Sequence, residues 1–127
     1  MPFDLKKWAK TFSLLGSSER LSIMIVLHGA EYIRHTHGDF VVKEACLSFS
    51  QIGEASEIKS DTRLSYHLSK LIHAGLVSKR AAQDKKGRVF PMYTPTKYWR
   101  DFASELGIDR QIKAYIKKKY PESFVES

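Results

Sequence analysis

Residues 60–77, SDTRLSYHLSKLIHAGLV, constrain the fold more than any other part of the chain. Their apolar residues recur with the spacing of one helix face, and Ser60 is of a type that caps helix N-termini. Gly75 is suited to ending a helix, and Leu76-Val77 begins a new apolar segment. The segment therefore predicts one helix over about 61–74, with a polar face that is either solvated or a binding surface. The residues of its predicted buried face are Leu64, Leu68, Leu71 and Ile72.

A shorter helical segment precedes this helix. Phe49-Ser50 indicates the end of a short strand passing into an N-cap, and a helix over about 51–57 follows, with Ile52 and Ala55 buried. Two helices joined by a turn of three or four residues form a helix-turn-helix unit.

A basic hairpin follows the helix-turn-helix directly. Residues 76–83 alternate in polarity, DKKG at 84–87 forms a turn, and 88–94 return as a second strand. Gly87 is available for a positive φ, and Pro91 requires an edge position in the ladder. The order of elements predicts a mainly α fold with a small β-hairpin wing, a winged helix-turn-helix with extra N- and C-terminal helices.

Two helices are predicted on the N-terminal side. Asp4 caps the first, and Ser17 or Ser18 caps a second that runs to about Arg34. The second is apolar nearly all round at 21–27, as expected for the central buried helix of a small domain.

Two more helices are predicted after the wing. Thr94 caps and Pro95 opens a helix to about Leu106, and Asp109 caps the last one. Segment 35–46 is the least readable part of the chain; within it, Phe40 to Val42 fit either a short strand or a helix extension.

Charge is concentrated in the predicted binding unit. The chain of 127 residues carries a net charge of +7, and residues 59–88 hold eight basic and two acidic residues, so 8 − 2 = +6. Such a concentration indicates a polyanionic partner. One domain is expected at this length, and the apolar run at 21–27 is too short to cross a bilayer. The N-terminus lacks a signal-peptide pattern and Cys46 is the single cysteine, so we expect a cytoplasmic protein without an intrachain disulfide. Cys46 fits a small core residue, with an intermolecular bridge as the alternative.

Between about residues 14 and 96 the sequence resembles the ArsR-type (arsenic-sensor-like) winged-helix regulators. The segments that carry the resemblance are LGSSERLSIMIVL, FSQIGEASEI, SYHLSKLIHAGLVSKR and GRVFPMYTPT, with the strongest match at Ser65-Tyr66-His67-Leu68, Leu71 and Ala74-Gly75-Leu76-Val77. The resemblance implies a dimeric, DNA-binding repressor. The Cys-x-Cys pair and the last-helix His/Asp ligands of the metal-sensing members have no counterpart here. We therefore predict no metal and no cofactor.

The predicted DNA-binding surface combines the polar face of helix 61–74 in the major groove with the wing at 79–90 on the backbone or minor groove. Arg63 is suited to a guanine edge, and Ser65 and Tyr66 to phosphates. For His67 a structural role and a phosphate contact stay open, and the wing lysines could equally be solubilising. The candidate DNA-binding residues are Ser50, Gln51, Lys59, Ser60, Thr62, Arg63, Ser65, Tyr66, His67, Ser69, Lys70, Lys79, Arg80, Lys85, Lys86 and Arg88.

The terminal helices carry apolar faces beyond what a winged-helix core needs, so they either pair across a two-fold dimer interface or complete a monomer core. We predict the dimer. The single domain 1–127 would then comprise a dimerisation helix at 1–16, a winged-helix core at 17–94 and dimerisation helices at 95–120. The candidate interface residues are Leu5, Trp8, Phe12, Trp99, Phe102, Leu106, Ile112 and Ile116.

Other signals carry less weight. His28, His35, His37 and Asp39 include metal-ligand types, but a polar loop rich in histidine is the commoner explanation of such a segment. No arrangement of nucleophile, base and orienting group emerges, so no enzyme activity is predicted. The sequence favours a transcriptional regulator that binds double-stranded DNA. The alternatives are a winged-helix protein-interaction module in a transcription or RNA-processing assembly, and binding of double-stranded RNA.

Overall fold

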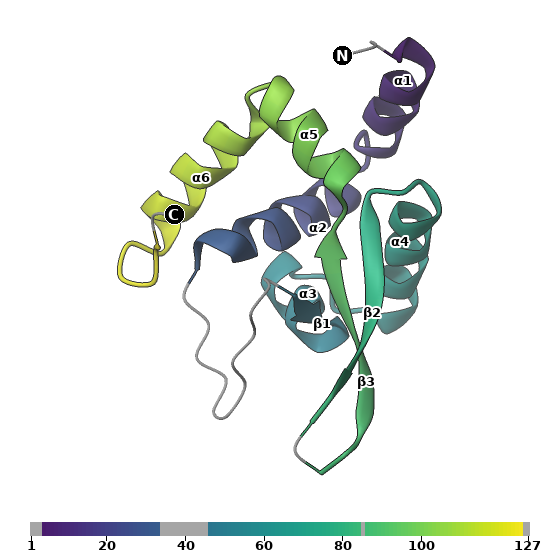
Figure 1. The fold of residues 1–127 in the computed structure, drawn as a ribbon, viewed down its shortest axis with the longest axis vertical. Coiled ribbons are helices and arrows are strands. Elements are labelled where there is room, and N and C mark those ends of the chain that lie inside the picture. Colours follow the sequence, from purple (N-terminus) through teal and green to yellow (C-terminus); the bar gives the residue numbers. More distant parts are fainter. Residues whose placement is uncertain (1–3, 34–45, 85, 126–127) are drawn as a thin grey trace.

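The computed structural model describes residues 4–33, 46–84 and 86–125 (Figure 1). These residues form six α-helices, one short 3-10 helix and a three-stranded sheet. In chain order the elements are α1 (Leu5–Leu14), α2 (Ser18–Gly29), the 3-10 helix η1 (Ala30–Tyr32), β1 (Leu47–Ser48), α3 (Phe49–Ser56), α4 (Asp61–His73), β2 (Val77–Gln83), β3 (Val89–Pro95), α5 (Lys97–Glu105) and α6 (Ile108–Lys119).

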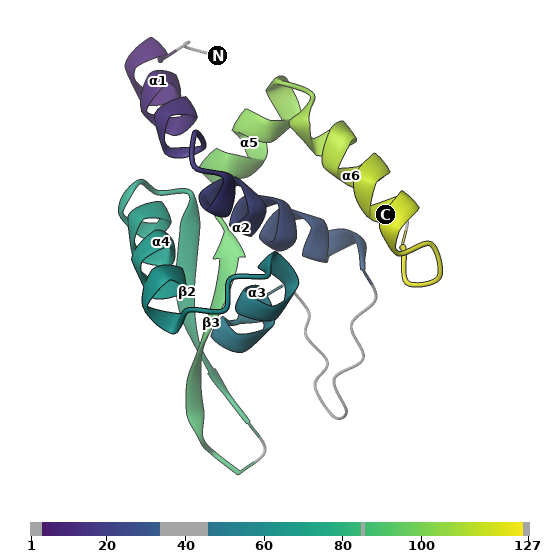
Figure 2. The ribbon, with the colours of Figure 1, turned by 180° about the vertical axis from the view of Figure 1, so that it is seen from behind.

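The predicted fold class is confirmed: the chain is mainly helical with a small β wing. The antiparallel sheet has the order β1-β3-β2, and β2 and β3 form the long hairpin that extends beyond the helices in Figure 2. Pro91 lies opposite Ala81 of β2, whereas β1 pairs only with Met92 and Tyr93 of β3. Pro91 therefore lies where β3 has no second partner strand, as a residue without an N–H donor requires.

Several helix boundaries differ from the sequence prediction because other residues supply the caps. α3 begins at Phe49, and its cap is Ser48 rather than Ser50. The Ser48 hydroxyl accepts a hydrogen bond from the Gln51 N–H, and the Gln51 side chain accepts one from the Ser48 N–H. This reciprocal capping box satisfies two backbone donors at once, which an N-cap at Ser50 would not do here. At the other end, Glu57 takes a left-handed conformation with φ 60°.

The helix after the wing begins later than predicted, and the last helix begins earlier. Pro95 pairs with Val77 as the last residue of β3, so α5 is capped by Thr96, whose hydroxyl accepts from the Trp99 N–H. The predicted cap Thr94 is instead a buried strand residue. α6 follows Gly107, which adopts φ 73°. On the N-terminal side, α2 ends at Gly29 and passes into η1 rather than continuing toward Arg34, which lies outside the described residues.

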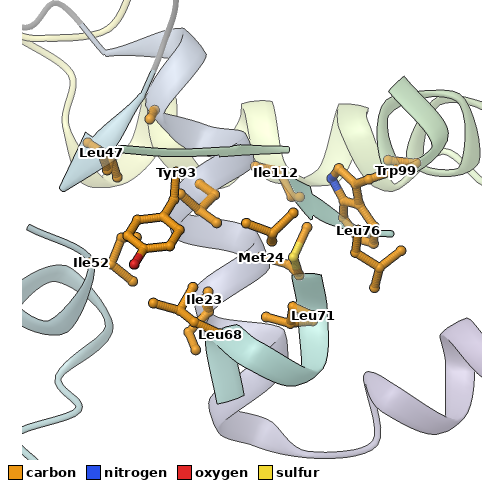
Figure 3. Close-up of a cluster of buried hydrophobic side chains, with 14 of the residues drawn as sticks. Ile23, Met24, Leu47, Ile52, Leu68, Leu71, Leu76, Tyr93, Trp99 and Ile112 are labelled. Carbon is orange, nitrogen blue, oxygen red and sulfur yellow. The ribbon is translucent and has the colours of Figure 1, made fainter. Parts of the chain in front are cut away.

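The core forms around α2, and α4 packs against it through the predicted apolar arc. Figure 3 shows Leu68 and Leu71 of α4 pointing toward Ile23 and Met24 of α2. These four side chains are buried, as is Leu64 one turn earlier in α4. The burial fixes the rotation of α4 and leaves its polar face outward.

The C-terminal helices complete this same core. Trp99 and Phe102 of α5 and Ile112 and Ile116 of α6 are buried within the chain. α6 approaches α2 so closely that a Cβ on Gly29 would lie 2.6 Å from Cδ1 of Ile116. These four residues were predicted for a dimer interface, and in the single chain they are already buried against other elements. An amphipathic pattern records that a face is covered, not which chain covers it.

The N-terminal helix, α1, is less completely packed against the rest of the domain. Trp8 and Phe12 of α1 each place a ring edge on Phe102, with ring centroids 5.3 Å and 5.4 Å away, and the Thr11 and Tyr98 hydroxyls are 2.8 Å apart. Phe12 nevertheless remains 52% exposed and Leu5 68% exposed. The helix projects from the body of the domain (Figure 2). Its exposed residues Leu5 and Phe12 form an uncovered apolar strip. No helix within the described residues is long and apolar enough to span a membrane.

Candidate nucleic-acid interface

The outward face of α4 consists of polar and charged side chains. It is bounded by the buried arc, and it lies beside α3 on one edge and the N-terminal turn of α2 on the other. Ser60 caps the helix by accepting from the Arg63 N–H, so the Ser60 side chain has a structural role. The exposed residues of this face are Asp61, Thr62, Arg63, Ser65, Tyr66, Ser69, Lys70 and His73.

A shallow open hollow lies between the start of α3 and the outward face of α4. Two aromatic residues line it, Phe49 and the 55% exposed Tyr66, and the Lys70 ammonium lies 5.4 Å from the centroid of the Tyr66 ring. A ligand in this hollow could place a methyl group against the apolar rings and a hydrogen-bond donor against the hydroxyls or the carboxylate. The lining residues are Phe49, Asp61, Thr62, Ser65, Tyr66 and Ser69.

Sequence reasoning missed two residues of this hollow, Phe49 and Asp61. The available signal for Phe49 was a large apolar residue directly before Ser50-Gln51, at the start of a short helix. Asp61 was counted only as an acidic residue. Of the α3 candidates, Ser50 is exposed, whereas Gln51 is half-buried and uses its side chain in the capping box. Lys59 is exposed in the turn between the helices.

The wing tip is organised by Asp84. Its Oδ1 accepts from the backbone N–H groups of Lys86 and Arg88 at 2.9 Å and 2.8 Å, and its Oδ2 accepts from Arg88 Nε at 2.8 Å. The backbone hydrogen bond from Arg88, helped by the guanidinium, holds the pKa of Asp84 below its usual value. Gly87 has the predicted positive φ, 82°. The tip therefore holds a defined turn.

The basic side chains of the wing lie along its exposed surface. Lys79 and Arg80 of β2 are exposed, as are Lys86 and Arg88 at the tip. Lys85, the fifth predicted basic contact, lies outside the described residues.

His67 is not among the exposed residues of α4. It is buried, with Nδ1 3.3 Å from a terminal nitrogen of Arg20 and Nε2 3.5 Å from Oε1 of Glu19. Because arginine can only donate, Nδ1 is the acceptor and the neutral ring carries its proton on Nε2. His67 therefore joins α4 to α2. It does not belong to the exposed face on which a DNA contact was predicted, and of the two roles left open for this histidine the structural one fits.

Arg63 lies on the same edge of α4 and is tied to the same carboxylate. Its guanidinium donates to Oε1 of Glu19 at 2.5 Å, although the Arg63 side chain is 63% exposed. This hydrogen bond holds the pKa of Glu19 below its usual value. The strongest base-reading candidate of the sequence is thus ion-paired to the first turn of α2 in the free protein.

A second polar cluster lies on the far side of α2, between η1, α5 and α6. The Trp99 indole N–H donates to His28 Nδ1 at 2.8 Å, so the proton of the neutral ring is on Nε2, which lies 2.6 Å from Oδ1 of Asp109. The Tyr32 hydroxyl donates to the same oxygen at 2.6 Å. Burial and this contact with Asp109 raise the pKa of Tyr32. Burial alone would raise the pKa of Asp109, but the hydrogen bonds from Tyr32 and His28 leave it below its usual value.

This cluster accounts for two sequence candidates. His28 was weighed as a metal ligand and is instead hydrogen-bonded on both ring nitrogens, and Asp109 was predicted as a helix cap. The other histidines of that proposed set, His35 and His37, and Asp39 lie outside the described residues. Across 4–33, 46–84 and 86–125, no three His, Cys, Asp or Glu side chains gather in a way that could hold a metal ion.

Two solved structures of one bacterial protein share this fold. The reduced form of the transcriptional regulator YodB from B. subtilis superposes with a TM-score of 0.60 and 19% identity, covering 91% of this chain and 94% of that chain. Diamide-treated YodB gives a TM-score of 0.58 and 18% identity, covering 94% and 97%. At this identity the likeness shows a shared fold alone, and it does not specify the ArsR type.

No curated protein matches the sequence. A family model described as a domain of unknown function, DUF7347, matches residues 8–83, which include α2, the helix-turn-helix and the first strand of the wing. Because this match spans more than half of the sequence, the chain belongs to the DUF7347 family.

Proposed function

We propose that this protein is a dimeric, sequence-specific regulator of transcription that binds double-stranded DNA, and that it represses by occluding a promoter. The observation that carries the proposal is the exposed polar face of α4, rigidly backed by the core and flanked by a basic wing. The fold shared with the transcriptional regulator YodB supports it, as does the ArsR-type motif around Ser65–Val77. This function requires no catalytic residue and no cofactor.

In this proposal the N-terminal half of α4 enters the major groove. Thr62 and Arg63 face the base edges, and Ser65, Tyr66, Ser69 and Lys70 contact bases or phosphates. Ser50 and Lys59 are exposed and would contact the backbone. The wing supplies the remaining cations, since Lys79, Arg80, Lys86 and Arg88 are exposed along one hairpin.

The test of this function is a competition gel shift with labelled promoter DNA from the protein's own operon. We expect excess unlabelled promoter duplex to displace the probe at concentrations at which random-sequence duplex and duplex RNA do not. Equal competition by RNA would favour the double-stranded RNA alternative. Failure of every nucleic acid to bind would overturn the proposal in favour of a protein-interaction module.

For the dimer, we propose an interface on the uncovered apolar strip of α1. The exposed large apolar residues among the predicted interface residues are Leu5, Phe12 and Leu106; Leu5 and Phe12 lie on α1, where Trp8 is half-buried. Residues 1–16 would then form the dimerisation helix of a single domain. The helices within 95–120 would serve mainly to complete the core at 17–94. Two copies would present their α4 helices about 34 Å apart, one turn of the DNA helix.

Phe12→Glu should convert the dimer to a monomer, because a carboxylate would have to be desolvated in the apolar interface. Analytical ultracentrifugation measures the change directly. The matched control is Tyr115→Glu, which alters a comparably exposed aromatic residue on α6. A wild-type protein that sediments as a monomer at every concentration would contradict the dimer without affecting the proposal that α4 binds DNA.

A further inference from the structure

Arg63 is proposed to contact DNA, but in the free protein it forms an ion pair with Glu19. Arg63 is the basic residue nearest the N-terminus of α4, where that helix would enter the groove. In the free protein its guanidinium is bonded to the Glu19 carboxylate at 2.5 Å. A guanidinium engaged in this way cannot present the same N–H groups to a guanine edge or a phosphate.

Glu19 is held in place by more than Arg63. It lies in the first turn of α2, where the helix dipole favours an anion. Nε2 of His67 lies 3.5 Å from the same carboxylate oxygen, and Arg20 contacts Nδ1 of that ring at 3.3 Å. The Glu19 side chain is 28% exposed, whereas that of Arg63 is 63% exposed. The carboxylate is therefore the anchored partner, and Arg63 is the one free to leave.

We propose that Glu19 competes with DNA for Arg63 and so lowers the affinity of the protein for DNA. This inference rests on the proposed function. Binding moves the Arg63 guanidinium from the Glu19 carboxylate to an acceptor on the DNA, and the carboxylate retains His67 as its remaining partner. Breaking the ion pair costs free energy. Every complex in which Arg63 contacts DNA therefore binds more weakly by that amount. Glu19 thus acts through Arg63 without itself contacting the ligand.

Glu19→Gln tests the proposal because glutamine preserves the shape of the side chain and removes its charge. The measurement is fluorescence-anisotropy titration of a short random-sequence duplex at low salt, with the melting temperature as a check on folding. An exposed ion pair is weak, so we expect Glu19→Gln to bind DNA about two- to fivefold more tightly than wild type. In an Arg63→Ala background, Glu19→Gln should change the affinity by less than the error of the titration.

The matched control is Glu31→Gln. Glu31 forms a comparable ion pair with Arg100, at 2.8 Å, which joins η1 to α5 away from the α4 face. Glu31→Gln removes the same charge as Glu19→Gln and should leave the affinity for DNA unchanged.

Each outcome has a distinct meaning. Tighter binding that disappears with Arg63→Ala supports the inference. Tighter binding that persists without Arg63, or that Glu31→Gln reproduces, overturns it, because the charge of Glu19 would then act by general repulsion. Unchanged or weaker binding of Glu19→Gln also overturns it while the proposed function stands. Only the absence of DNA binding by wild type would remove the proposed function as well.

Discussion

Trp99→Ala should lower the free energy of unfolding by about 3–5 kcal/mol, the usual cost of deleting a large buried aromatic side chain. Trp99 is completely buried, and its ring lies 5.8 Å from that of Phe102 and 6.1 Å from that of His28, measured between centroids. The substitution would leave a cavity where α5 meets α2. It would also leave His28 Nδ1 without the indole donor. Urea unfolding followed by circular dichroism measures the effect.

Two further variants separate the causes of this loss. Trp99→Phe keeps most of the apolar volume but removes the N–H, and should cost about 1–3 kcal/mol because a buried acceptor loses its donor. Tyr115→Ala removes an aromatic side chain that is 48% exposed on α6, and should change stability by no more than about 0.5 kcal/mol. If Trp99→Ala unfolds at the same urea concentration as Tyr115→Ala, the hydrogen-bonded cluster does not hold the C-terminal helices to the core.

DNA affinity should fall steeply with salt, by a factor of about 10³–10⁵ between about 50 mM and about 200 mM if the dimer contacts 6–10 phosphates. The physical cause is the release of cations condensed on the duplex when lysine and arginine side chains replace them. A plot of log affinity against log salt concentration, from anisotropy titrations, should have a slope on the order of −5 to −9. A flat plot would contradict DNA binding through α4 and the wing.

The wing provides a matched pair of lysines for this measurement. Lys86→Ala at the tip should weaken binding to all sequences alike and flatten the slope by about 1 for each phosphate that the ammonium no longer neutralises. Lys97 lies at the start of α5 and pairs with Asp101 at 3.4 Å, so Lys97→Ala should leave the slope unchanged. Equal slopes for the two variants would show that the wing tip does not contact the backbone.

α4 shows which features of the fold local sequence patterns predict. The cap at Ser60, the apolar arc of Leu64, Leu68 and Leu71, and the exit at Gly75 are signals contained within one turn or two of the residues they describe. The structure confirms all of them. The hairpin was equally predictable, since a turn with Gly87 between two alternating segments has few other conformations.

Predictions failed where residues distant in the sequence decide the outcome. The apolar faces of α5 and α6 were visible in the sequence, but nothing local distinguishes packing on α2 from packing on a second chain. For His67 two roles stayed open because the helical pattern does not reveal that Arg20, 47 residues earlier, would bind its ring. The hollow beside Phe49 likewise depends on how α3 and α4 cross.

The sequence by itself determined the winged-helix order of elements, the buried arc of α4 and the concentration of positive charge around it. Helix capping, periodicity and turn chemistry depend on residues a few positions apart. Only the tertiary structure decided which side chains of α4 are free and which are engaged by α2. The Glu19–Arg63 and Arg20–His67 contacts exist because the core brings the start of α2 beside α4. Side-chain partnerships across such distances follow from packing, and packing is a property of the whole chain.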